Sequence, residues 1–92
     1  MPITIYLSGH LKSFTGGKTE VELEADVDSV QVALDLLWKS HPALRDRILN
    51  EQGEIRQHVN IFLGSDDVKR LDGLKTAVES NEIHIFNAVS GG

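Results

Sequence analysis

Cysteine is absent from this sequence of 92 residues. Its absence excludes disulfide bonds, metal sites built from thiolates and a cysteine nucleophile. The sequence also lacks a long apolar run, and its N-terminus has no charged segment followed by an apolar one, so neither a membrane span nor a signal peptide is predicted. We therefore expect a soluble protein of the cytoplasm with no membrane partner.

Basic residues are few, with nine Lys and Arg against 14 Asp and Glu, and the net charge is -5. Proteins that bind nucleic acid gain affinity by neutralising phosphates with cations, so this balance argues against a nucleic-acid partner. The apolar fraction of 40% is that of an ordinary folded chain, and the length suits one compact domain. We expect a single domain over residues 1–92.

Several segments alternate apolar and polar residues with the period of two that is typical of half-buried strands. We predict five strands, at residues 3–7, 19–24, 58–63, 68–71 and 82–86. A long, loose loop over residues 9–18 would join the first two strands, and an acidic turn would follow the third.

A helical period replaces this alternation from Asp28 onward. The apolar residues Val30, Ala33, Leu34 and Leu37 recur at the spacing of one helix face. Asp28 is the predicted N-cap, with Gln31 completing a capping box, and the helix should end near Ser40. Pro42 suits the first turn of a second, short helix. Strands and helix together predict an α+β domain with the helix packed on one sheet face.

The side chains form no recognised catalytic or metal-binding constellation. Gly17-Lys18-Thr19 has the last residues of a phosphate-binding loop, but Lys12 stands where that motif needs glycine, and a strand follows instead of a helix. The four histidines, at positions 10, 41, 58 and 84, lack ligand spacing. No serine has a nucleophile-elbow context. We expect no bound metal or cofactor and no catalytic side chains.

The C-terminal residues Ala88-Val89-Ser90-Gly91-Gly92 follow directly on the last predicted strand, and no charged side chain comes after Glu82. Successive glycines make the thinnest peptide and can thread a narrow channel in a partner's active site. The alternative is a frayed end without a function. The sequence therefore predicts a flexible tail, with Ser90 and Gly91 as threading residues.

Further motifs accompany this tail: Val-Asn-Ile-Phe-Leu at 59–63, an acidic turn, Leu71-Asp72-Gly73-Leu74 followed by Thr76, and Ile-Phe-x-x-Val-Ser before the two glycines. With these motifs the chain resembles the MoaD/ThiS sulfur carriers, which are ubiquitin-like β-grasp proteins. The resemblance covers the whole chain and is greatest for the CysO-type carriers of cysteine biosynthesis and for archaeal ubiquitin-like modifiers. Asn87-Ala88 stands where molybdopterin-type carriers often have two prolines.

The resemblance implies a mixed sheet of four to five strands, with the first and last strands side by side at its centre and one main helix on one face. It also implies that an activating enzyme of the ubiquitin-activating type uses ATP to adenylate the Gly92 carboxylate. Sulfur then replaces AMP, and the thiocarboxylate donates sulfur in the biosynthesis of cysteine or another metabolite, rather than of molybdopterin or thiamin. The implied partners are that enzyme, a sulfur-accepting synthase and a JAB-type metalloprotease.

Strand parity combined with this topology predicts an aromatic patch on the sheet face away from the helix. The patch would consist of Tyr6, Phe62, His84 and Phe86 and would bind a partner. The alternative is that these rings only cover their cross-strand neighbours and stabilise the sheet.

Two other functions stay open at this point. One is a ubiquitin-like protein modifier, in which Gly92 is joined to lysine amines of target proteins. The other is a non-covalent binding module whose two terminal glycines have no role.

Overall fold

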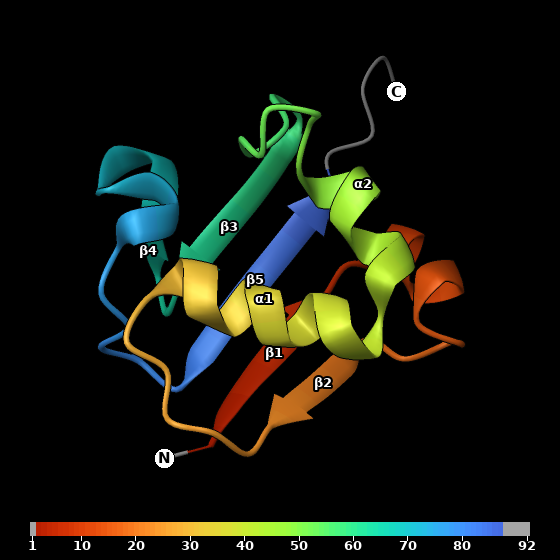
Figure 1. Cartoon of the computed structure of the whole chain (residues 1–92), viewed down its shortest axis with the longest axis horizontal. Helices are drawn as coiled ribbons and strands as arrows, with labels where there is room; N and C mark the ends of the chain where they lie inside the picture. Colours follow the sequence, from red (N-terminus) through yellow and green to blue (C-terminus); the bar gives the residue numbers. More distant parts are fainter. Residues whose placement is uncertain (1, 88–92) are drawn as a thin grey trace.

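The computed structural model describes residues 2–87 of the chain. These residues fold into a five-stranded mixed sheet with one main helix lying across it (Figure 1). In sheet order the strands are β2 (Glu20–Leu23), β1 (Ile3–Leu7), β5 (Glu82–Asn87), β3 (Val59–Leu63) and β4 (Asp66–Asp67). The two central strands, β1 and β5, run parallel, and all other neighbours are antiparallel. The helix α1 (Val30–Ser40) lies across one face. The predicted α+β class and β-grasp arrangement are confirmed.

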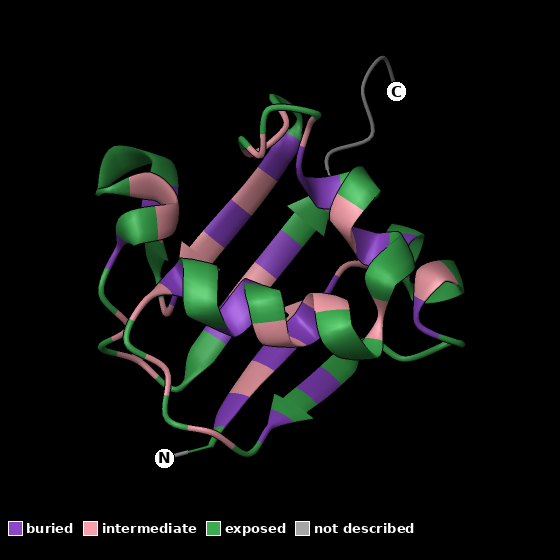
Figure 2. Cartoon of the chain, in the orientation of Figure 1, coloured by how far each residue is buried: buried purple, intermediate pink, exposed green. Residues whose placement is uncertain are grey.

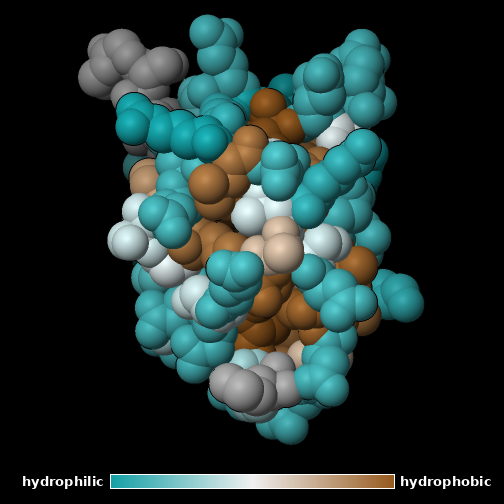
Figure 3. Space-filling view, turned by 90° about the vertical axis from the view of Figure 1, so that its left-hand side faces the viewer, coloured by the Kyte–Doolittle hydropathy of each residue, from teal (hydrophilic) through white to brown (hydrophobic). Residues whose placement is uncertain are grey.

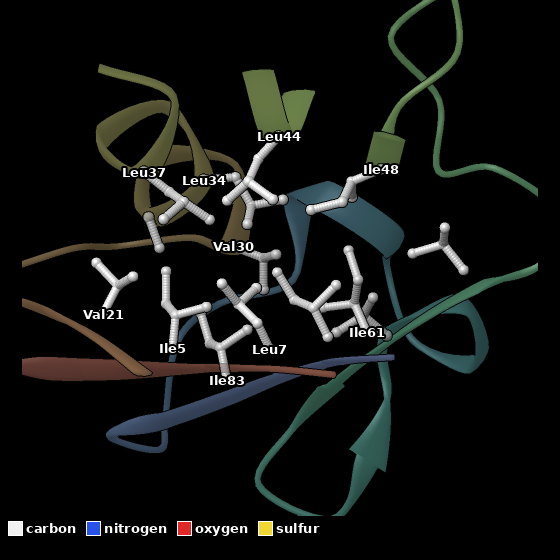
Figure 4. Close-up of a cluster of buried hydrophobic side chains, with 14 of the residues drawn as sticks. Ile5, Leu7, Val21, Val30, Leu34, Leu37, Leu44, Ile48, Ile61 and Ile83 are labelled. Atoms are coloured by element: carbon white, nitrogen blue, oxygen red, sulfur yellow. The ribbon is translucent and has the colours of Figure 1, made fainter. Parts of the chain in front are cut away.

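The core lies between the sheet and the helices that cover it, and alternate residues of the strands point into it (Figure 2). The predicted helix stripe is confirmed, since Val30, Ala33, Leu34 and Leu37 of α1 are all buried. The labelled core residues in Figure 4 are Ile5, Leu7, Val21, Val30, Leu34, Leu37, Leu44, Ile48, Ile61 and Ile83. The apolar residues of the strand alternation and of the helix stripe therefore pack together in one core.

The second helical segment begins at Pro42, as predicted. It consists of a 3-10 turn, η2 (Pro42–Leu44), and one turn of α-helix, α2 (Arg45–Ile48). Leu44 and Ile48 are fully buried against the same core. In the described part of the chain, no helix is long and apolar enough to cross a membrane.

The predicted N-cap of α1 is wrong by one residue. Ser29, not Asp28, caps the helix, and its hydroxyl oxygen accepts a hydrogen bond from the Val32 amide at 3.3 Å. Ser29 also forms an isolated antiparallel bridge with Ala77, and the Asp28 carbonyl accepts from the Val78 amide at 3.1 Å. This bridge to a distant segment holds the backbone extended through Ser29, so the helix starts later than the local pattern indicates.

The predicted strand at 68–71 is also wrong. Pairing with β3 is confined to Asp66–Asp67, and Val68–Arg70 forms a 3-10 turn, η3. The Asp67 carboxylate accepts from the Lys69 amide at 2.9 Å and so initiates the turn. Val68, the first residue of this turn, is fully buried, so its apolar side chain reaches the core without a strand.

The segment predicted as a loose loop after β1 is ordered instead. Gly9–Phe14 forms a 3-10 helix, η1, that buries Leu11 completely. The Thr15 hydroxyl lies 3.0 Å from the Lys12 carbonyl oxygen and 2.5 Å from the Lys18 carbonyl oxygen, and it closes the segment. One buried leucine and one hydroxyl hold together a stretch whose composition indicates a flexible loop.

Candidate functional site

The sheet face away from α1 is the candidate functional site, because it gathers the four aromatic residues that the sequence predicts there. Register places Tyr6 of β1 beside His84 of β5, and His84 beside Phe62 of β3. Phe86 follows two residues later on β5 and so shares their face. Their neighbours in sequence, such as Ile85, point into the core. The predicted parity of all four residues is confirmed.

The rings of this aromatic patch (Tyr6, Phe62, His84 and Phe86) contact one another in series. Tyr6 and His84 stack with centroids 4.7 Å apart and an interplanar angle of 13°. His84 and Phe86 lie 6.1 Å apart at 13°, and Phe62 meets Phe86 edge-on at 5.8 Å and 69°. The rings therefore stabilise the sheet as cross-strand pairs. Phe86 nevertheless keeps 45% of its surface exposed, so the patch also offers apolar area to a partner.

Carboxylates surround the Tyr6 end of the patch. Glu20 of β2 lies opposite Tyr6 in the antiparallel pair, and the Glu82 carboxylate oxygen Oε1 lies 3.1 Å from His84 Nε2. The pKa of the Tyr6 phenol is raised above its ordinary value of 10.0 by lost solvation and by the negative charges of Glu82 and Glu20. The negative charges of two carboxylates thus both oppose ionisation of the Tyr6 hydroxyl group.

At the opposite edge, the patch continues into a shallow groove. The groove is lined by Phe62, Ser65, Asp66, Asp67, Arg70 and Leu71. Leu71 is 49% exposed and adds apolar surface to the groove beside Phe62. Figure 3, which looks onto the side of the molecule where β4 and the segment after it lie, shows apolar surface in a band between hydrophilic side chains.

Sequence analysis missed three of these residues as parts of the site: Glu20, Arg70 and Leu71. Leu71 was expected in an edge strand, and nothing in the local pattern shows that η3 turns it toward Phe62. Placing Glu20 beside the aromatic residues requires the pairing of β2 with β1, which the local sequence pattern does not give. The predicted threading and reacting residues Ser90, Gly91 and Gly92 lie outside the described residues.

Metal chemistry finds no support in the described residues. The structure brings together no three His, Asp or Glu side chains there in a way that could hold a metal ion. Aromatic contact area, a carboxylate margin and a groove are features of a surface that binds another protein.

Comparison with known proteins gives a consistent set of relatives. The family model described as ThiS family matches residues 5–92. Small archaeal modifier protein 1 of Haloferax volcanii is 37% identical over 87 residues, covering 94% of this chain and 95% of that protein. Sulfur carrier protein CysO of Mycobacterium tuberculosis is 27% identical over 95 residues and covers 100% of both. A chain of the Amycolatopsis orientalis BexX/CysO complex superposes with a TM-score of 0.85 at 26% identity, covering 98% of this chain and 99% of that one.

Proposed function

Because the chain belongs to the ThiS family, we propose that it is a sulfur carrier whose Gly92 carboxylate becomes a thiocarboxylate. The family relatives found for it are sulfur carriers and ubiquitin-like modifiers. In the proposed role the protein is a co-substrate. Its partners supply the catalytic side chains, and the activating enzyme binds the ATP.

The proposed chemistry takes place at one carbon atom. A Gly92 carboxylate oxygen attacks the α-phosphorus of ATP, a new P–O bond forms, and pyrophosphate leaves. The resulting acyl-adenylate has an electrophilic carbonyl carbon. A hydrosulfide-level sulfur donor then attacks that carbon, the C–O bond to AMP breaks, and the thiocarboxylate forms with loss of one proton. Glycines at positions 91 and 92 would let this carbon reach a narrow active site.

The observation that carries the proposal is the position of the exposed aromatic rings on β5. Phe86 and His84 lie on the strand that leads into residues 88–92, and β5 ends at Asn87, five residues before Gly92. Five residues span at most about 18 Å when extended. A partner that covers Phe86 therefore has the reacting carboxylate within the dimensions of one active site.

The proposed first partner is an activating enzyme of the ubiquitin-activating type, which docks on the aromatic patch. That the related CysO of Amycolatopsis orientalis was crystallised in a complex with BexX supports a protein partner for this fold in general. A sulfur-accepting synthase would follow, and a JAB-type metalloprotease would release the carrier where the sulfur acceptor becomes joined to it. The similarity to CysO favours cysteine as the sulfur metabolite.

Deletion of Gly92 tests the proposal at the reacting atom. ATP–pyrophosphate exchange by the cognate activating enzyme should occur with the parent protein and be abolished by the deletion. His10→Ala, an exposed substitution in η1, is the control and should leave exchange unchanged. Both variants should keep the parent's urea unfolding midpoint, since a terminal residue and an exposed side chain contribute little to stability. Undiminished exchange by the truncated protein would disprove the carrier role and favour a non-covalent binding module.

The aromatic patch can be tested in the same exchange assay. Phe62→Ala should raise the carrier concentration for half-maximal exchange by roughly thirtyfold, since loss of an aromatic anchor commonly weakens binding by about 2 kcal/mol. The maximal rate should stay unchanged, because the substitution does not alter Gly92. An unchanged half-maximal concentration, with the variant shown to be folded, would assign the rings to sheet stability alone.

A ubiquitin-like protein modifier is the second candidate function, and the similarity to Haloferax volcanii small archaeal modifier protein 1 favours it. This route shares the adenylation step, but a lysine amine of a target protein attacks the carbonyl carbon and an isopeptide bond results. The last tryptic site of this chain is Lys75, so a target peptide whose lysine carries residues 76–92 in isopeptide linkage would support the modifier role. Thiocarboxylate on the free protein supports the carrier role.

A further inference from the structure

The charged strand residues on the open sheet face are all carboxylates. Ten strand residues of the described chain point away from α1 on this face: Thr4, Tyr6, Glu20, Glu22, Asn60, Phe62, Asp67, Glu82, His84 and Phe86. Four of them are carboxylates and none is Lys or Arg. The rest of the chain contains nine basic and ten acidic residues, so its side chains nearly balance. Most of the net charge of the protein therefore lies on one face of its sheet.

Three of these carboxylates, Glu20, Glu22 and Glu82, lie together, and we call them the acidic corner. Register places Glu22 and Glu82 on either side of Thr4, and Glu20 beside Tyr6. Glu20 and Glu22 form no ion pair with any residue of the described chain, whereas Glu82 contacts His84. The raised pKa of Tyr6 agrees with this arrangement, because lost solvation and the charges of Glu82 and Glu20 all contribute to it.

The opposite edge of the patch differs in charge. There Asp67 shares the groove beside Phe62 with Arg70, so carboxylate and guanidinium are both present. The face therefore has a direction, negative at the β2 edge and mixed at the β4 edge, with the aromatic rings between them. A surface with this pattern fits a partner in only one orientation.

We propose that the protein covering the aromatic patch presents Lys or Arg side chains to the acidic corner, and that this charge pairing accelerates association and sets the orientation of the bound carrier. The inference rests on the proposed function, which makes the activating enzyme that partner. A second copy of this chain is disfavoured as the occupant, because pairing this face with itself would bring together two surfaces that both carry net negative charge. Nucleic acid and anionic membranes are disfavoured by the same repulsion.

Charge reversal at the β2 edge distinguishes the contribution of the proposed ion pairs to binding from that of the aromatic contact. The variant Glu20→Lys/Glu22→Lys changes two exposed side chains of an edge strand. Asp35→Lys/Glu51→Lys changes two exposed side chains away from the sheet face and adds the same charge. Stopped-flow association with the cognate activating enzyme should be slowed about tenfold or more by the first pair at low ionic strength. The control pair should slow association less at that ionic strength, because its charges lie off the open sheet face. It should stay within about twofold of the parent near 0.1 M salt, where the screening length is about 10 Å.

Salt and the dissociation rate complete the test. The difference between the first pair and the parent should shrink as ionic strength rises, since steering by charge is screened. Phe62→Ala should instead raise the dissociation rate and leave association nearly unchanged. Equal slowing by both charge pairs would show that net charge alone acts, and would overturn the inference. Unchanged or faster association of the Glu20→Lys/Glu22→Lys variant would overturn it too, as would a parent protein that the enzyme does not bind.

The proposed function is judged by a different readout in the same experiment. At saturating concentration the Asp35→Lys/Glu51→Lys control should reach the parent's maximal exchange rate, because it alters neither Gly92 nor the open sheet face. A parent that binds with the predicted charge dependence but shows no exchange would reject the carrier chemistry and leave the docking surface in place.

Discussion

Single residues of the site were predictable where strand parity alone decides their orientation. Tyr6, Phe62, His84 and Phe86 alternate with buried neighbours, so their common face could be predicted from period two and a strand order. The stacking of His84 on Tyr6 could not, because it depends on the register between β1 and β5. The positions of Glu82 and Glu20 near Tyr6 follow from this register and from the register between β1 and β2, respectively.

Tyr6 gives a direct measurement of those carboxylates, because it is the only tyrosine in the sequence. Phenolate absorbance should titrate with a midpoint above 10.0 in the folded protein. Glu20→Gln/Glu82→Gln should lower this midpoint, since less negative charge opposes the phenolate, but burial should keep it above the ordinary value. The folded protein holds the Tyr6 phenol proton more tightly than the unfolded chain does. The contribution of this proton to the free energy of unfolding is therefore complete below pH 10 and is lost as pH rises through the raised pKa. A midpoint unaffected by the double substitution would contradict the acidic corner.

At the scale of elements, the long periodic segments and the short helical segment at Pro42 were predicted correctly, whereas the start of α1, the η1 helix and the η3 turn were not. The stripe of α1 and the strands β1, β3 and β5 have strong periods that tertiary contacts reinforce. The start of α1, the η3 turn and the η1 helix are set by a bridge to Ala77, a capping carboxylate at Asp67 and one buried leucine. Such contacts join residues that the local pattern treats separately.

The N-cap of α1 can be tested with two neighbouring substitutions. Ser29→Ala should lower the free energy of unfolding by about 1 kcal/mol, because the Val32 amide loses its acceptor. Asp28→Ala should change it by less than about 0.5 kcal/mol, since the hydrogen bond of Asp28 to Val78 uses only its backbone carbonyl. Urea denaturation of the two variants measures the difference. A larger loss for Asp28→Ala would restore the capping box that the sequence pattern indicates.

At the scale of the whole molecule, the parallel pairing of β1 with β5 relates fold to function. This pairing places the last strand at the sheet centre (Figure 1), and strand parity places Phe86, one residue before the end of β5, on the open face. Periodicity does not specify the order of strands, and the order was available before the structure only through the family resemblance. The charge asymmetry of the face became visible only once all five strands were in place, because its four carboxylates come from β2, β4 and β5.

The intact mass of the protein after reaction with its activating enzyme, ATP and sulfide tests the carrier role most directly. The account predicts a mass change equal to the exchange of one oxygen for one sulfur, located at Gly92 and absent when ATP is omitted. The same change should be absent after deletion of Gly92. An unchanged mass in a reaction that consumes ATP, or a product joined only to lysine side chains of other proteins, would contradict a thiocarboxylate carrier.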